Sequence, residues 1–115
     1  MIQSVEEMIT KYVAAWNNNT PEEFKVAFAE CWAADGTYTD PEFELIQGVD
    51  GIAALAVESL KRVPSRKFSV YTQPEHHHNS GRYNWQVHLP EGDKVGFDYF
   101  EFNNEFKITR IVSFF

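Results

Sequence analysis

The order in which helical and extended patterns follow one another limits this chain to few folds. Apolar residues recur at three- and four-residue spacing in the first half, whereas the second half is rich in Phe, Val, Tyr and Thr in extended runs. Helices that cluster first and strands that cluster last are typical of an α+β domain. We therefore expect helices packed on one face of an antiparallel sheet.

Capping and breaking residues set the expected limits of three helices. The first spans 2–17, and Thr20–Glu23 then combines an N-cap, a proline at the first helical position and a capping box. The second helix is expected to end at Asp35. The third begins after Asp50, a candidate N-cap, and stops before Pro64.

The extended segments are expected to form one sheet. A short strand over 37–40 ends before a proline, and residues 42–47 allow a second short strand. The longer strands are expected over 66–73, 77–89, 94–102 and 106–115. No linker or repeat interrupts the pattern, so we expect a single domain over 1–115.

Charge and cysteine content exclude several classes of protein. The net charge is −7 and no basic stripe is present, so neither nucleic acid nor a membrane surface is expected as a partner. Cys31 is the only cysteine, which excludes an intrachain disulfide. The acidic start lacks the pattern of a signal peptide, which predicts a cytoplasmic protein.

One carboxylate interrupts an apolar face of the predicted sheet. If Pro90 lies opposite Asp93 in the hairpin, Asp98 faces Trp85 on the inner face, close to Tyr83. An ionised carboxylate is unfavourable in apolar surroundings unless it takes up a proton or finds a donor. A buried aspartate in this position therefore favours a functional role.

The opposite face of the same hairpin is also rich in apolar residues. Ten Phe, five Tyr and three Trp are many for 115 residues, and Val95, Phe97 and Tyr99 lie together on this outer face. Such a face is too apolar for open solvent. We expect it to pack against a second copy of the chain in a homodimer.

Three polar groups are expected to converge inside the fold. Tyr12 lies on the inner face of the first helix, Asp40 ends the first strand, and Asp98 points in from the sheet. A carboxylate base with donors for a developing enolate oxygen suits proton abstraction next to a carbonyl group. Apolar walls are expected from Trp32, Trp85 and Phe115.

Five stretches of the sequence resemble one family. They are Met8–Val13, Trp32–Pro41, Gly48–Ile52, Phe97–Phe102 and Ile108–Phe115. Along nearly its whole length the chain resembles the SnoaL-like branch of the nuclear-transport-factor-two-like superfamily. That superfamily includes ketosteroid isomerases, polyketide cyclases, scytalone dehydratase and limonene-epoxide hydrolase, and also members without a catalytic role. The resemblance implies three N-terminal helices on a curved antiparallel sheet that encloses an apolar pocket.

Within this superfamily the site resembles that of the ketosteroid isomerases. This resemblance implies that Asp40 is the general base, that Tyr12 and a protonated Asp98 donate to the oxyanion, and that no cofactor or metal takes part. It implies isomerisation, cyclisation or dehydration of a small apolar substrate. The implied pocket residues are Trp16, Trp32, Tyr83, Trp85, Phe100, Ile111, Ser113 and Phe115. The chain departs from the family at Ala56, where a supporting tyrosine is usual, and at its closing phenylalanine, where tryptophan is usual.

Other interpretations stay open for these residues. Asp40 before Pro41 can cap a turn, Tyr12 can be a core tyrosine, and Asp98 can pair with Arg110. An inward Arg110 would give the Asp–Arg–Asp arrangement of an epoxide hydrolase, although the resemblance places this arginine outside. A pocket filled by its own aromatic residues would instead indicate a non-catalytic ligand-binding or dimerisation module.

The three consecutive histidines His76–His78 do not predict a metal site. Successive side chains of a strand point to opposite faces, so three in a row cannot converge on one ion. A partnership of His77 with an acid would suit a cyclase-type mechanism and is kept as a minor alternative.

Overall fold

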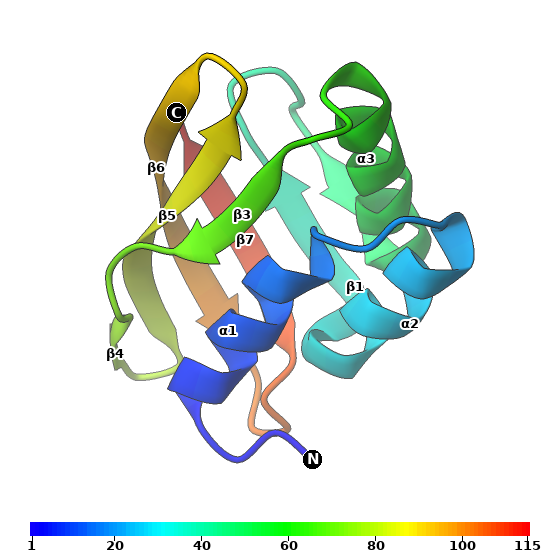
Figure 1. Ribbon diagram of the computed structural model, residues 1–115. Coiled ribbons are helices and arrows are strands. Elements are labelled where there is room, and N and C mark those ends of the chain that lie inside the picture. The colour runs from blue at the N-terminus through cyan, green and yellow to red at the C-terminus, as the bar shows by residue number, and fades with distance from the viewer.

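The computed structural model describes residues 1–115 as three helices packed on one side of a curved seven-stranded sheet (Figure 1). The helices are α1 (Val5–Ala15), α2 (Pro21–Cys31) and α3 (Gly48–Arg62). The strands are β1 (Trp32–Thr39), β2 (Ile46–Gln47), β3 (Lys67–Val70), β4 (Glu75–His77), β5 (Ser80–Leu89), β6 (Gly92–Phe102) and β7 (Ile108–Phe114). The predicted α+β class is confirmed.

The sheet is mixed, which corrects the prediction of a purely antiparallel one. Its strands follow the order β2-β1-β7-β6-β5-β3, and β4 pairs with β5. β1 and β7 run parallel, with Trp32 opposite Ile108 and Tyr38 opposite Ile111, whereas the other pairs are antiparallel. Alternation of apolar residues shows which face of a strand is buried but carries no information on its direction, so the pattern could not reveal the parallel pair.

The hairpin of β5 and β6 has a register two residues away from the expected one. Leu89 pairs with Gly92, so the turn contains only two residues, and Asp98 lies opposite Tyr83 rather than Trp85. A shift by two positions leaves each side chain on its original face, because side chains alternate with period two. The prediction of the inner face was therefore right, although the predicted cross-strand partners were wrong.

The predicted capping box at the start of α2 is confirmed. The Thr20 hydroxyl accepts from the Glu23 backbone N–H, and the Glu23 carboxylate accepts from the Thr20 backbone N–H, each at 3.1 Å. The end of α2 differs from the prediction, because Trp32 is already extended and begins β1. Pairing of Trp32 with Ile108 outweighs the helical spacing that continues locally toward Asp35.

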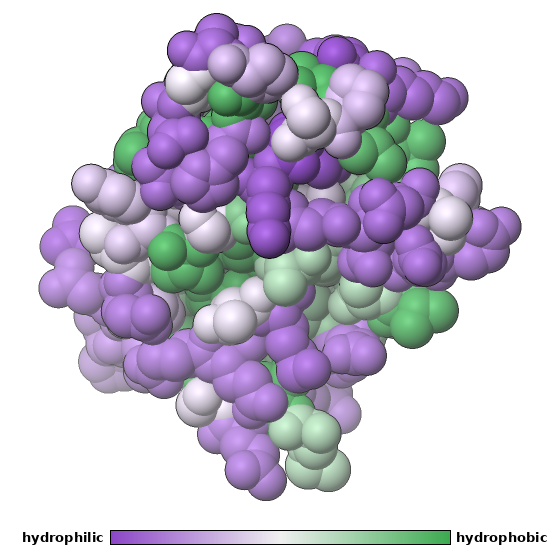
Figure 2. All heavy atoms as spheres, viewed as in Figure 1, coloured by the Kyte–Doolittle hydropathy of each residue, from purple (hydrophilic) through white to green (hydrophobic).

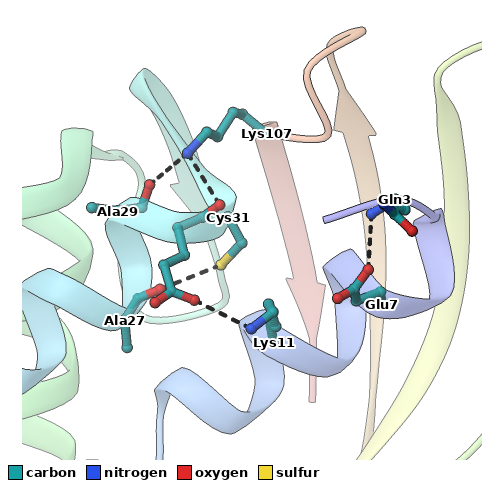
Figure 3. Close-up of polar contacts among 8 residues, drawn as sticks. Gln3, Glu7, Lys11, Ala27, Ala29, Cys31 and Lys107 are labelled. Atoms are coloured by element: carbon teal, nitrogen blue, oxygen red, sulfur yellow. Dashed lines mark hydrogen bonds and ion pairs between the residues drawn. The ribbon is translucent and has the colours of Figure 1, made fainter. Parts of the chain in front are cut away.

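A lysine from a distant turn satisfies the carbonyl groups at the end of α2 (Figure 3). This helix has no basic residue in its last turn. Lys107 Nζ donates instead to the carbonyl oxygens of Ala29 and Glu30, at 2.7 and 3.1 Å. A cation at a helix C-terminus also interacts favourably with the helix dipole. The contact fixes the turn between β6 and β7 to the helical layer.

The other helix starts also differ from the expected ones. α1 begins at Val5, because Ser4 is its N-cap and accepts from the Glu7 N–H at 3.1 Å. α3 follows Gln47, which makes no side-chain cap, and Gly48 opens the helix with a φ of 78°. Asp50 therefore lies in the first turn, exposed and 3.7 Å from Lys25 Nζ, rather than at the N-cap.

Buried residues of the three helices and the inner face of the sheet form one hydrophobic core. The view in Figure 2 shows a largely hydrophilic surface on the helical side, with hydrophobic residues exposed in separate small patches. Cys31 is fully buried in this core, as its place on the apolar stripe of α2 predicts. None of the three helices has the length and hydropathy that a membrane-spanning helix needs.

Candidate active site

A cavity of about 630 Å³ lies between the helices and the inner face of the sheet. Hydrophobic residues make up 14 of the 22 that line it, which suits an apolar ligand. α1 and α3 contribute one wall, and β5, β6 and β7 contribute the other. Tyr12, Asp40 and Asp98, the three residues expected to converge, all line this cavity.

Asp98 is buried, and both of its carboxylate oxygens accept hydrogen bonds. The Tyr83 hydroxyl donates to Oδ2 at 2.5 Å, and the Trp85 indole N–H donates to Oδ1 at 2.9 Å. Burial raises the pKa of Asp98 to about 6, whereas hydrogen bonds from Ser113, Tyr83 and Trp85 lower the pKa and hold it at that value. Such a group can exchange a proton near neutral pH.

Gly96 allows Trp85 to reach Asp98. Trp85 lies directly opposite Gly96, and a Cβ at this glycine would come within 2.1 Å of the indole ring. The ring therefore crosses the neighbouring strand over the glycine and donates to the aspartate two positions further along. The missing side chain is what permits the hydrogen bond.

We expect Gly96→Ala to destabilise the protein by about 1–3 kcal/mol, because the added methyl group overlaps the indole ring. Displacement of Trp85 would also remove its hydrogen bond to Asp98. Urea unfolding followed by tryptophan fluorescence measures both effects. Lys94→Ala, at an exposed position on the same strand, is the matched control and should change stability by less than about 0.5 kcal/mol. Equal stability of the two variants would contradict this account of Gly96.

Asp40 is held by three donors at the end of β1. The Tyr38 hydroxyl donates to Oδ2, and the backbone N–H groups of Glu42 and Phe43 donate to Oδ1, each at 2.8 Å. The two backbone contacts cap the turn that follows, which is the structural role kept open for this residue. Its oxygens are therefore already occupied in the absence of a ligand.

Tyr12, which lines the cavity, is fixed by aromatic packing. Its ring stacks on Trp32 with centroids 5.6 Å apart and lies edge-on to Trp16 at 6.4 Å. Burial, followed by the charge of Asp98, raises the pKa of Tyr12 well above its ordinary value. The phenol therefore stays protonated and can donate to an oxygen atom in the cavity.

Ser113 of β7 lies opposite Asp98, and Ser113 and Tyr38 both line the cavity. Burial, followed by the charge of Asp40, raises the pKa of Tyr38 well above its ordinary value. This phenol therefore stays protonated and donates its hydrogen bond to Asp40.

Five of the eight expected pocket residues line the cavity, namely Trp16, Tyr83, Trp85, Ser113 and Phe115. The other three, Trp32, Phe100 and Ile111, lie in the closed core behind it. Trp32 is covered by Tyr12, and Phe100 packs behind Tyr83 with ring centroids 5.9 Å apart. The inner face was assigned correctly. Alternation along a strand does not show, however, whether an inward residue lines the cavity or is buried in the core behind it.

Two alternative site residues lie away from the cavity. Arg110 is exposed on the outer face, with Nη1 3.7 Å from Glu101, so the Asp–Arg–Asp arrangement is not formed. The histidines are exposed as well, with His76 3.4 Å from Glu6 and His77 in contact with His78. None of the four histidines of the chain lines the cavity.

Sequence reasoning missed Arg66, which lines the cavity and is only 6% exposed. Its Nε donates to the Ser59 hydroxyl at 2.7 Å, and its Nη2 donates to the Ala56 carbonyl at 3.2 Å. The strand pattern held a signal, because a residue two positions before Phe68 shares its inward face. This arginine adds a buried positive charge to a largely apolar wall.

The fold and the cavity together define a cone-shaped α+β domain with a buried acid–base group. No family model matches the sequence, and no curated protein matches it. Among solved structures, a proposed isomerase of the SnoaL-like family from Agrobacterium tumefaciens strain C58 is similar at 30% identity. The match covers 93% of this chain and 92% of that one, with a TM-score of 0.82. This chain belongs to the SnoaL-like family.

Two further structures are similar in fold. A protein with a ketosteroid isomerase-like fold from Catenulispora acidiphila DSM 44928, solved in complex with trimethylamine, has a TM-score of 0.76 at 16% identity, covering 97% and 87% of the two chains. A proposed ketosteroid isomerase from Kribbella flavida DSM 17836 has a TM-score of 0.71 at 20% identity, covering 96% and 76%. At these identities the likeness concerns the fold alone.

Proposed function

We propose that this protein is a cofactor-free isomerase, cyclase or lyase that abstracts a proton next to a carbonyl group of a small apolar substrate. One observation carries the proposal. Asp98 is a buried carboxylate with a pKa of about 6 at the wall of a cavity of about 630 Å³. A base whose pKa is close to the working pH accepts and returns a proton efficiently.

The proposed step uses residues that already line the cavity. Asp98 takes the proton from the carbon next to the carbonyl, and the electron pair of that C–H bond moves to form an enolate. Tyr12 donates a hydrogen bond to the enolate oxygen, where negative charge develops. In an isomerisation, the proton then returns from Asp98 to a different carbon of the same molecule, so that no other reactant is required.

This assignment moves the role of general base to Asp98 from Asp40, to which the resemblance to ketosteroid isomerases had given it. The hydrogen bonds that Asp98 accepts, including those from Tyr83 and Trp85, oppose the effect of burial, so its pKa of about 6 leaves it ionised at neutral pH, as a base requires. Asp40 accepts three, two of them from the turn that it caps. We therefore assign Asp40 to the orientation of Tyr38 and of the loop that follows.

Exchange of carbon-bound hydrogen in D₂O tests the proposal without knowledge of the natural substrate. Apolar cyclic ketones and β-keto esters would be incubated with the protein, and loss of the α-proton signal followed by NMR. We expect the exchange rate to rise with pH as Asp98 ionises and to level off above about pH 6. A rate that falls through this range would instead identify protonated Asp98 as the donor and overturn our assignment.

A non-catalytic ligand-binding module is the second candidate function. It is supported by the fact that the oxygens of both carboxylates already have donors within the protein. A non-catalytic module whose own aromatic residues fill the pocket is inconsistent with the cavity beside Asp98. Binding of the ketones without any exchange at any pH would favour this candidate.

We also propose that the outer face of the sheet forms a homodimer. Val95 and Phe114 are exposed by 47% and 55%, and the Phe97 ring packs on Phe114 with centroids 6.1 Å apart. Light scattering should give about twice the chain mass of 13.3 kDa. Phe97→Asp should give a monomer, whereas Val26→Asp, a control at an exposed apolar residue of α2, should not. A monomeric wild-type protein would contradict the proposal.

A further inference from the structure

One cation in the cavity wall has no counter-charge in the protein. Arg66 directly precedes β3, lines the cavity and is 6% exposed. None of the ion pairs of the chain includes it. The acidic residue at the mouth of the cavity, Glu42, pairs with Arg62 at 3.7 Å instead. A buried charge without a partner is unfavourable, so its presence requires an explanation.

The guanidinium group is held in place along one edge only. Nε donates to the Ser59 hydroxyl and Nη2 to the Ala56 carbonyl, both on α3, and the group lies 5.1 Å from the centre of the Phe68 ring. Nη1 has no hydrogen-bond partner. Among the buried side-chain nitrogen and oxygen atoms of the chain, it alone lacks one. Native proteins satisfy nearly all such atoms with protein groups or ordered water, so an exception at a cavity wall indicates a missing partner.

We infer that the ligand of this cavity carries a carboxylate that binds Arg66. The inference rests on the proposed function, in which the cavity holds a small molecule. A carboxylate supplies both the negative charge and the planar pair of acceptors that match a guanidinium group. Lys94, at the same cavity and without an ion pair, adds positive charge to this region in a chain whose net charge is −7.

The position of Arg66 also limits the shape of the ligand. Lys67 pairs with His88, which places Arg66 beside Leu89, whereas Asp98 pairs with Tyr83. Tyr83 and Leu89 are the first and last β5 residues that line the cavity, separated by roughly 20 Å of strand. The arginine side chain reaches back over part of this length toward α3. The ligand is thus an elongated apolar acid whose carboxylate lies well away from the carbon next to Asp98.

Binding of matched acids and amides tests this inference. The probes are cyclohexyl-substituted acetate, butanoate and hexanoate and their primary amides, which have nearly the same shape but no charge. Quenching of Trp16 and Trp85, which line the cavity, reports binding. We expect the wild-type protein to bind at least one acid about tenfold or more tightly than its amide. Arg66→Met should abolish this preference and leave binding of the amide unchanged.

Two control variants keep the result interpretable. Ser59→Ala removes a structural partner of Arg66 but keeps its charge, so the preference for the acid should persist even if the protein is less stable. Lys94→Met removes a nearby exposed charge and should reduce the preference by less than Arg66→Met does. An equal loss in both charge variants would overturn the assignment to Arg66, because the general potential at the mouth would then explain it.

The remaining outcomes separate this inference from the proposed function. If the wild-type protein binds acids and amides equally well, the carboxylate inference is wrong, while the apolar cavity remains a small-molecule site. If no probe of either series binds, both the inference and the proposed small-molecule site are contradicted. Thermal unfolding of each variant shows that the comparison is made between folded proteins.

Discussion

Asp98→Asn is expected to lower the rate of α-proton exchange by at least about 100-fold, the usual contribution of a positioned general base. The amide cannot accept a proton from carbon near neutral pH. The rate of the variant should also lose the rise with pH that ionisation of Asp98 produces in the wild-type protein. Comparison of the two pH profiles therefore separates loss of the base from a general loss of structure.

Asparagine is a suitable replacement because the hydrogen bonds around position 98 can adapt to it. The asparagine carbonyl can accept from Trp85, and its NH₂ group can donate to Tyr83, whose hydroxyl can act as donor or acceptor. Asp93→Asn, at an exposed carboxylate of the same strand, is the matched control and should keep the wild-type rate. An unchanged rate in Asp98→Asn would contradict the proposed role and direct attention to Asp40.

The second large effect concerns stability as a function of pH. The pKa of Asp98 is about 6 in the folded protein, against 3.8 ordinarily, so the folded state binds this proton more tightly than the unfolded state does. The contribution of Asp98 to stability is therefore greatest below the ordinary pKa and is lost as the pH rises through the folded-state pKa. Ionisation of this one group should lower the free energy of unfolding by about 2–3 kcal/mol between about pH 4 and pH 7.

Urea unfolding of the wild-type protein and of Asp98→Asn across this range measures the effect. Other acidic residues titrate in both proteins, so the difference between the two free energies of unfolding isolates Asp98. We expect the wild-type protein to lose stability relative to the variant as the pH rises. A difference that stays constant would mean that Asp98 has its ordinary pKa, and a difference of opposite sign would mean that its pKa is lowered.

Local signals predicted the parts of this fold that depend on neighbouring residues. The capping box at Thr20 and the apolar stripes of the helices involve contacts within one or two turns, so the sequence displays them directly. The inner position of Asp98 followed from alternation along β6, which does not depend on the exact partner in β5. These features led to the correct superfamily and to three residues that do line one cavity.

Features that depend on distant contacts could not be predicted in the same way. Trp32 continues the helical spacing of α2, yet it begins a strand because Ile108 pairs with it. Arg66 lies inside because Ser59 and Ala56, on a preceding helix, accept its hydrogen bonds. In each case the deciding partner is far along the chain or on another element, and no local pattern contains it.

The parallel pairing of β1 with β7 has a consequence for the folding of this protein. It joins the first long strand of the chain to the last, so the loop that must close spans about two thirds of the 115 residues. Contacts of such sequence separation form slowly, because much chain entropy is lost before they form. Until β7 is in place, β1 and β6 each have an open edge, and Ser113 is missing from beside Asp98. We therefore expect the acid–base site to be completed only in a late stage of folding, when β7 pairs with β1 and β6.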